Sequence, residues 1–324
     1  MARADLLVSL VRAVRRGDDV SFERTVEALI AEERTKQHHV LADRLEELLR
    51  GNGQRPSRGF SPAVAAVSPD VRELLSERQP RRRLEDLLLP DVVLSAVTEV
   101  VEEQQRAELL RAHNLEPRHR ILLAGPPGNG KTSLAEALAD ALLLPFLVVR
   151  YEGVIASFLG ETTVRLHRLL DAVRTRQCLI FFDEFDAIAK ERGDIHETGE
   201  IKRVVSSLLL ELDDLPSYVT VVVASNHPEL LDRAVWRRFQ LRLLLPAPTP
   251  SQVEEWLRRF EKRLGSPLGV AERTVLTTLS GLSFAELEEF GLDVQRRYVL
   301  HGGQESLTKI VRDRLSQWKH RFTV

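Results

Sequence analysis

The sequence predicts an α/β fold with a parallel sheet that has helices on both faces. Between residues 84 and 246, four short apolar runs alternate with longer segments of helical periodicity. This alternation is typical of a parallel sheet, because the crossover helices pack on its two faces. The expected strands are residues 121–124, 146–149, 179–182 and 219–224, and the expected helices are residues 133–143, 163–173 and 202–212.

The strand-like pattern is confined to the middle of the chain, which divides the sequence into parts. Residues 1–50 contain three short amphipathic stretches and predict a small helical N-terminal bundle, either a cap on the main domain or a docking module for a partner. Residues 51–83 are rich in Gly, Pro, Ser and Arg and predict a linker. Residues 84–246 form the predicted α/β core, and residues 247–324, with helical periodicity only, form an all-helical lid.

The composition excludes several classes of protein. The 324 residues are 43% hydrophobic and 29% charged, which is typical of a globular protein. No apolar run approaches the roughly 20 residues of a membrane-spanning helix, and the N-terminus lacks a secretory signal, so we expect a cytoplasmic protein without membrane contact. The net charge of −2 argues against a nucleic-acid partner, because such binders usually have a basic excess.

A glycine-rich loop follows the first expected core strand. Residues 125–132 have the sequence GPPGNGKT, which matches G-x-x-x-x-G-K-[ST] between a strand and a helix. The glycines allow backbone N–H groups to turn toward a phosphate, and the helix start adds partial positive charge. The ammonium group of Lys131 is expected near the β- and γ-phosphates, and the hydroxyl of Thr132 is expected to bind Mg²⁺. The motif therefore predicts a P-loop NTPase that binds ATP and Mg²⁺.

Two acidic residues follow the third expected strand. In P-loop NTPases an acidic residue at this position holds Mg²⁺, directly or through water, and we assign this role to Asp183. Glu184 is then placed to act as general base on the attacking water, although paired acids at a strand end can also cap the next helix. The predicted ATP-binding residues are Pro127, Gly128, Asn129, Gly130, Lys131, Thr132, Ser133 and Asp183.

Three segments together resemble one family of P-loop NTPases. Residues 125–132, 183–186 (DEFD) and 221–226 (VVVASN) are similar to the central AAA group within the AAA+ proteins, which includes katanin, spastin and the membrane-bound AAA proteases. The resemblance extends from about Leu84 to the C-terminus. It implies that Asn226 occupies the family's sensor-1 position, where an amide orients water between the acidic strand and the γ-phosphate.

The resemblance also implies a catalytic contribution from a second subunit. Residues 231–239 (LDRAVWRRF) resemble the segment that holds the family's arginine fingers, which reach the nucleotide of a neighbouring subunit and stabilise charge on the transferring phosphoryl group. Arg237 and Arg238 occupy these positions. The family usually separates its two arginines by two residues, one of them glycine, whereas here they are adjacent. The sequence therefore leaves open whether one or both act.

Further matches concern the substrate and the nucleotide base. The segment SFLGE resembles the family's pore loop, and implies that Phe158, Leu159 and Gly160 grip a polypeptide by stacking and apolar contact. The alternative is that Phe158 belongs to the core of a short helix. Residues 281–287 (GLSFAEL) resemble the family's G-x-S-x-A-[DE]-L segment, and residues 113–117 lie where the family contacts the adenine.

These features predict ATP hydrolysis by a ring-shaped homo-oligomer, hexameric when active, that remodels, unfolds or disassembles polypeptide substrates. A protease or another partner is expected to dock on residues 1–50. Two alternatives remain: a DNA-associated AAA+ regulator or loader, and a nucleotide switch that works with a fixed partner such as a separate protease. The sequence contains no H-E-x-x-H zinc motif and no G-x-S-x-G elbow, so we expect any proteolysis to come from another chain.

Overall fold

The computed structural model describes residues 25–28, 30–31, 34, 71, 73–150, 159–186, 207–231, 233–301 and 305–321. The chain divides into two compact units, Met1–Ser61 and Pro62–Val324. In the first unit the described residues are helical, and Val26 and Ile30, about one helical turn apart, are buried. The rest of the predicted N-terminal bundle lies outside the described residues. No helix in the described ranges has the length and apolar character needed to cross a bilayer.

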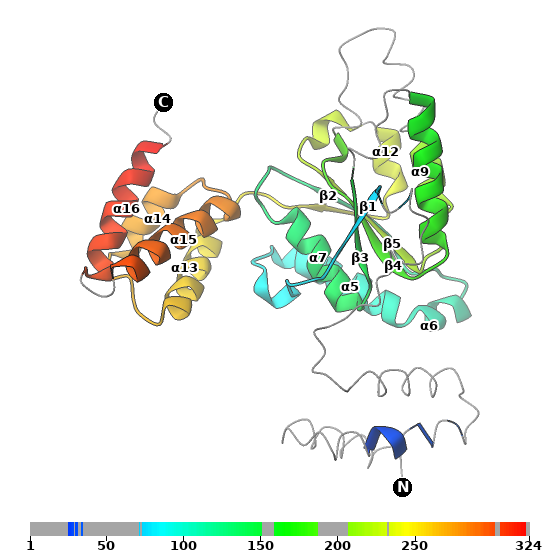
Figure 1. Ribbon diagram of the computed structural model, residues 1–324, viewed down its shortest axis with the longest axis horizontal. Helices are drawn as coiled ribbons and strands as arrows, with labels where there is room; N and C mark the ends of the chain where they lie inside the picture. Colours follow the sequence, from blue (N-terminus) through cyan, green and yellow to red (C-terminus); the bar gives the residue numbers. More distant parts are fainter. Residues whose placement is uncertain are drawn as a thin grey trace. The chain divides into compact units, whose positions relative to one another are not determined.

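The second unit contains a six-stranded sheet with the order β1-β3-β4-β5-β2-β6 (Figure 1). Neighbouring strands are parallel, except that β1 runs antiparallel to β3. The strands are β1 (Leu75–Arg78), β2 (Arg120–Ala124), β3 (Phe146–Val149), β4 (Cys178–Phe182), β5 (Val219–Ser225) and β6 (Leu241–Leu244). All four predicted strands are present, and the α/β prediction is confirmed.

The two edge strands, β1 and β6, are absent from the sequence prediction. β1 lies within the predicted linker of residues 51–83, so that prediction is wrong for Leu75–Arg78. Three of these four residues are polar, and β6 alternates between buried Leu243 and exposed neighbours. An edge strand is paired on one side only and can keep a polar surface, so it lacks the continuous apolar run of an inner parallel strand.

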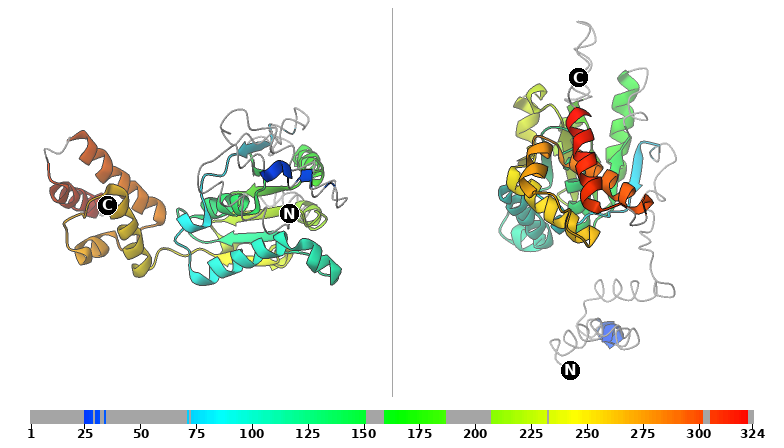
Figure 2. Two further views of the ribbon diagram at one scale, coloured as in Figure 1. Left: turned by 90° about the horizontal axis from the view of Figure 1, so that it is seen from below. Right: turned by 90° about the vertical axis from the view of Figure 1, so that its left-hand side faces the viewer.

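Helices cover both faces of the sheet (Figure 2). Strand side chains alternate between the faces, so adjacent Leu122 and Leu123 belong to two different hydrophobic clusters. The cluster around Leu123 includes α5 (Asp91–Gln105) and α7 (Lys131–Leu142), and the cluster around Leu122 includes α9 (Leu159–Arg174), helical residues 207–213 and α12 (Arg233–Arg238). The shorter helix α6 (Ala107–Ala112) follows α5.

Strand order brings together segments that are far apart in the sequence. β5 pairs with β4 on one side and with β2 on the other, and all three are parallel. The acidic pair after β4, Asn226 after β5 and the glycine-rich loop after β2 therefore leave the sheet at the same edge. This edge is where ligands bind in open α/β sheets.

The C-terminal part is helical and has a hydrophobic core of its own. Its helices are α13 (Pro250–Leu264), α14 (Glu272–Leu279), α15 (Phe284–Leu300) and α16 (Leu307–Arg321). Both α13 and α15 begin with a capping box: Thr249 pairs with Gln252, and Ser283 pairs with Glu286. These reciprocal hydrogen bonds satisfy helix N–H groups that have no partner inside the helix, which fixes where each helix begins.

Candidate functional site

The loop between β2 and α7 depends on glycine conformations. Gly125, Gly128 and Gly130 have φ values of 142°, 77° and 86°, which L side chains rarely adopt. A Cβ on Gly125 would lie 2.2 Å from the carbonyl oxygen of Leu245. The N–H of Gly125 donates to the carbonyl of Ser225 at 3.2 Å, so the loop begins in contact with the end of β5.

Lys131, the first residue of α7, is only 6% exposed. Its Nζ donates to the carbonyl oxygens of Gly125 at 2.8 Å and Pro126 at 2.9 Å. Burial lowers the pKa of Lys131, and the carboxylates of Asp183 and Asp186 act in the opposite direction. An ammonium group has three donors, so these two carbonyls leave capacity for an anionic ligand.

A hydroxyl and two carboxylates lie beside this loop. The Thr132 hydroxyl donates to Asp183 Oδ2 at 2.9 Å, and the N–H of Glu184 donates to Asp183 Oδ1 at 3.0 Å. Glu184 has a φ of 48°, a left-handed conformation that costs a non-glycine residue about 1–2 kcal/mol. Such strain is concentrated at functional sites, which makes Glu184 a candidate for chemistry.

The ends of β4 and β5 are joined by a buried acid. Asp186 is buried, and its Oδ1 accepts from the N–H of Asn226 at 3.0 Å. This bond fixes the backbone of Asn226 relative to the acidic pair. Asp183 is half-buried and Glu184 is exposed toward the loop side of the sheet edge.

A cavity of about 490 Å³ lies at this edge of the sheet. All eight predicted ATP-binding residues line it, and so do Glu184 and Asn226. The volume lies within the range of roughly 300–1,000 Å³ that is usual for small-molecule sites. The structure thus brings together all of the predicted residues that come from the loop, β4 and β5.

The rest of the lining is largely apolar, and the sequence analysis missed most of it. Leu87, Leu88 and Leu89 follow the short helix η2 (Leu84–Asp86), and Trp256 and Phe284 come from the helical C-terminal part. No motif marks the three leucines or Trp256, because an apolar run or an aromatic at helical spacing looks the same whether it faces a core or a ligand. Phe284 lies within residues 281–287, which the family resemblance marks.

Trp256 is held in place by a closed cycle of contacts. Its Nε1 donates to Glu288 Oε1 at 2.7 Å, and Glu288 forms an ion pair with Arg263 at 3.2 Å. The Arg263 guanidinium lies 5.5 Å from the ring centroid of Phe260, which is stacked on Trp256 at 5.3 Å. Gly291 permits this packing, since a Cβ there would lie 3.1–3.2 Å from both rings. The cycle fixes one wall of the cavity.

The start of α15 contacts the glycine-rich loop directly. The N–H of Ala285 donates to the carbonyl of Gly128 at 2.9 Å, and the N–H of Phe284 donates to Asn129 Oδ1 at 3.4 Å. A Cβ on Gly128 would lie 2.8 Å from the Ser283 hydroxyl oxygen. The segment 281–287, which the sequence analysis singled out, therefore touches the phosphate-binding loop.

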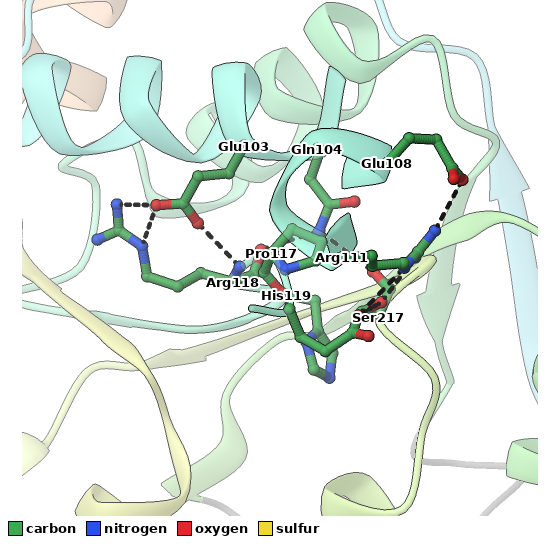
Figure 3. A network of polar contacts seen from close by, with 9 residues as sticks. Glu103, Gln104, Glu108, Arg111, Pro117, Arg118, His119 and Ser217 are labelled. Atoms are coloured by element: carbon green, nitrogen blue, oxygen red, sulfur yellow. Dashed lines mark hydrogen bonds and ion pairs between the residues drawn. The ribbon is translucent and has the colours of Figure 1, made fainter. Parts of the chain in front are cut away.

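Residues 113–117, which lie in sequence where the family contacts the adenine, are not among the described residues that line the cavity. They precede the amino end of β2, whereas the loop follows its carboxyl end, roughly 13 Å away for a five-residue strand. Glu116 and Pro117 adjoin a polar network (Figure 3). In it the Ser217 hydroxyl donates to Glu116 at 2.6 Å, Arg118 donates to Glu103 at 2.8 Å, and Gln104 donates to the Arg118 and Ser217 carbonyls. Nearness in sequence to the first core strand gave no information about which end would face the ligand.

The remaining predicted site residues lie elsewhere. Arg237 and Arg238 end α12, and neither is among the described residues that line the cavity. Arg238 instead forms an ion pair with Asp213. Phe158 lies outside the described residues, and Leu159 and Gly160 are the first two residues of α9.

Comparisons with known proteins agree with this site. Residues 121–247 match the family model "ATPase family associated with various cellular activities (AAA)". The chain is 34% identical over 291 residues to the uncharacterized AAA family ATPase y4kL of Sinorhizobium fredii, which covers 89% of this chain and 87% of that protein. It is 36% identical over 243 residues to the ATP-dependent zinc metalloprotease FtsH 1 of Symbiobacterium thermophilum, which covers 72% of this chain and 41% of that protein.

A solved structure shares the fold. The crystal structure of the FIGL-1 AAA domain superposes with a TM-score of 0.59 at 20% identity, and the match covers 80% of this chain and 91% of that chain. The chain spans less than half of the FtsH 1 protease but most of y4kL. On the strength of the loop, the acidic strand and a match over nearly all of a relative's length, the chain belongs to the AAA family of ATPases.

Proposed function

We propose that the chain hydrolyses Mg²⁺-bound ATP in the 490 Å³ cavity and uses this reaction, as a ring-shaped oligomer, to remodel polypeptides. The observation that supports the proposal best is the meeting of Lys131, the Thr132–Asp183 pair and Glu184 at the edge formed by three parallel strands. These are the groups that phosphoryl transfer to water requires: a cation, oxygen ligands for Mg²⁺ and a base.

The glycine-rich loop binds the phosphates in this proposal. The backbone N–H groups at the start of α7 point toward the loop, and the helix dipole favours an anion there. Lys131 exchanges its present carbonyl partners, Gly125 and Pro126, for phosphate oxygens. The apolar lining around Leu88 and Trp256 accommodates the base.

The chain has a suitable pair of ligands for Mg²⁺. The Thr132 hydroxyl and the Asp183 carboxylate are hard oxygen donors, already 2.9 Å apart, and Mg²⁺ is usually bound by one or two protein oxygens together with phosphate and water. When bound, the ion neutralises charge that builds up on the β- and γ-phosphate oxygens. Asp183 binds it directly or through water.

Glu184 and Asn226 act on the attacking water. Glu184, which lines the cavity and has a strained backbone at φ 48°, accepts its proton. Asn226 orients the same water through its amide, since its backbone is fixed to Asp186 at 3.0 Å. One or both of Arg237 and Arg238 serve the site of a neighbouring subunit, since neither is among the described residues that line the chain's own cavity.

The remodelling part of the proposal rests on the relatives and on the pore-loop resemblance. FtsH 1 is by name an ATP-dependent metalloprotease, so at least one relative couples ATP to a polypeptide substrate. Phe158, Leu159 and Gly160 grip the substrate in a hexameric ring, and residues 1–50 dock a partner, such as a separate protease. We propose a cytoplasmic location for this assembly.

Glu184→Gln tests the proposal. The amide keeps the size of the side chain but cannot accept the proton, so kcat should fall roughly 100-fold or more while ATP is still bound. Loss of ATP-driven unfolding of a fluorescently labelled polypeptide should accompany the loss of turnover. Phosphate release, equilibrium ATP binding and unfolding are measured on the same preparation.

The matched control is Glu272→Gln, the same change at an exposed residue in the first turn of α14. It should turn over like the parent chain. Turnover near the parent rate in Glu184→Gln would refute the base assignment, and hydrolysis that never unfolds or disassembles any polypeptide would refute remodelling.

A further inference from the structure

The two arginines at the end of α12 have different surroundings. Arg237 is exposed and has no polar partner among the residues that the structure describes. Arg238 forms an ion pair with Asp213, which ends the helical residues 207–213. Successive residues on a helix point about 100° apart, so the two arginines leave α12 in different directions.

Asp213 is shared by a second arginine. Arg120, the first residue of β2, donates to Asp213 Oδ1 at 2.7 Å, while Arg238 contacts Oδ2. The Arg120 and Asp213 side chains are only 17% and 21% exposed, and that of Arg238 is 41% exposed. Burial lowers the pKa of Arg120, and the charge of Arg238 acts in the same direction. One carboxylate therefore compensates two guanidinium groups, and withdrawing Arg238 would break the shared arrangement.

Gln240, two residues after the end of α12, holds this end of the helix against β2. Gln240 Oε1 accepts from the N–H groups of His119 at 2.9 Å and Arg120 at 3.1 Å, and the Gln240 N–H donates to the Arg120 carbonyl at 3.0 Å. Val235 and Phe239 are buried in the core beneath α12. The position of the backbone that carries Arg237 is thus set by contacts on both sides of it.

We infer that Arg237 alone reaches the nucleotide of a neighbouring subunit, and that Arg238, Asp213 and Arg120 are positioning residues that hold α12 for it. This inference rests on the proposed ring. It decides between one and two acting arginines, which the sequence leaves open. Arg238 has its partner inside its own subunit, whereas Arg237 presents five N–H donors to solvent and can bind a phosphate in a bidentate manner.

Arginine-to-lysine changes separate the two roles. Lysine keeps a charge but lacks the planar fork, so it preserves a simple ion pair better than it replaces a bidentate phosphate contact. Arg237→Lys should lower kcat at least roughly 100-fold without changing Tm, in line with the large effects of trans-acting arginines. Arg238→Lys should keep turnover within about threefold of the parent chain. Arg238→Ala and Asp213→Asn should lower turnover and Tm together, Tm by a few °C.

Mixing subunits tests the ring itself. Arg237→Ala and Glu184→Gln subunits are each inactive alone, but a mixed ring contains sites with an intact Glu184 next to an intact Arg237, so turnover should reappear. If it reappears and Arg238→Lys is as inactive as Arg237→Lys, the division of roles is overturned while the ring stands. If Arg237→Lys turns over normally, the division of roles is overturned. If no mixture regains turnover, action across subunits fails, and with it both proposals.

Discussion

Basic residues lie near both ends of β2, but their partners differ. At the carboxyl end, the buried ammonium of Lys131 donates, among the described residues, to two loop carbonyls, and a cavity of about 490 Å³ lies beside it. At the amino end, Arg118 and Arg120 pair with Glu103 and Asp213 within the chain. A charge that contacts its counter-charge inside the fold stabilises the fold, and a buried charge that contacts only neutral carbonyls is available to a ligand.

Gly125→Ala should have the largest effect on this comparison, because it disrupts the glycine-rich loop at the carboxyl end of β2. The new Cβ would lie 2.2 Å from the Leu245 carbonyl oxygen at a φ of 142°, so the loop must move. A displacement that costs about 2.7 kcal/mol of binding free energy lowers ATP affinity roughly 100-fold. Equilibrium binding of a fluorescent ATP analogue measures it.

Gly265→Ala is the control for the loop variant. Gly265 also has a positive φ, 70°, but nothing lies near a Cβ there. Its stability should drop by about 1–2 kcal/mol from backbone strain alone, and its ATP affinity should not change. An unchanged affinity in Gly125→Ala would show that the loop tolerates a side chain and that the close approach to Leu245 does not determine its shape.

Glu103→Gln should have an intermediate effect, confined to the amino end. The Glu103 carboxylate accepts from the Arg118 N–H and guanidinium at 2.8–2.9 Å and is only 25% exposed. Removing its charge should lower the free energy of unfolding by about 1–2 kcal/mol, as measured by urea denaturation, and leave ATP affinity unchanged.

Glu99→Gln is matched to it, since Glu99 contacts the same arginine but is 59% exposed. The free energy of unfolding of Glu99→Gln should fall by no more than about 0.5 kcal/mol. Equal losses in the two variants would mean that burial does not distinguish these ion pairs. A change in ATP affinity in either one would show that the two ends of β2 are not independent.

The smallest expected effect is a pH dependence from His119, which is buried at the amino end. Burial lowers its pKa, Arg120 acts in the same direction, and Glu116 opposes it. The unfolded chain therefore takes up this proton at a higher pH than the folded chain. The stability contribution is complete above the ordinary histidine pKa of about 6.5 and is lost as the pH falls below it.

Thermal unfolding between pH 7.5 and pH 5.5 measures this dependence. Tm of the parent chain should decline by a few °C over this interval, and His119→Gln should decline less. His113→Gln, a change at an exposed residue, should decline like the parent chain. Identical curves for all three chains would mean that His119 is protonated equally well in the folded protein.

The sequence predicted the inner part of the sheet and missed its borders. The strands β2, β3, β4 and β5 are buried on both faces, so each is a continuous apolar run that is visible in one dimension. The edge strands β1 and β6 have mixed polarity, because one side of each faces solvent. The same limit applied to the cavity: the P-loop was found by its motif, and the apolar lining at Leu88 and Trp256 was not.

The sequence by itself determined the features that a few consecutive residues can specify. Glycine spacing fixes the shape of the phosphate loop, and an apolar run that ends in Asp183 and Glu184 fixes a strand with acids at its end. Only the tertiary structure decided which side chains found a partner within the chain: it paired Arg238 with Asp213, which lies 25 residues earlier, and left Arg237 exposed. Local conformation follows from short-range sterics, whereas pairing depends on distances through space that strand order and helix packing set.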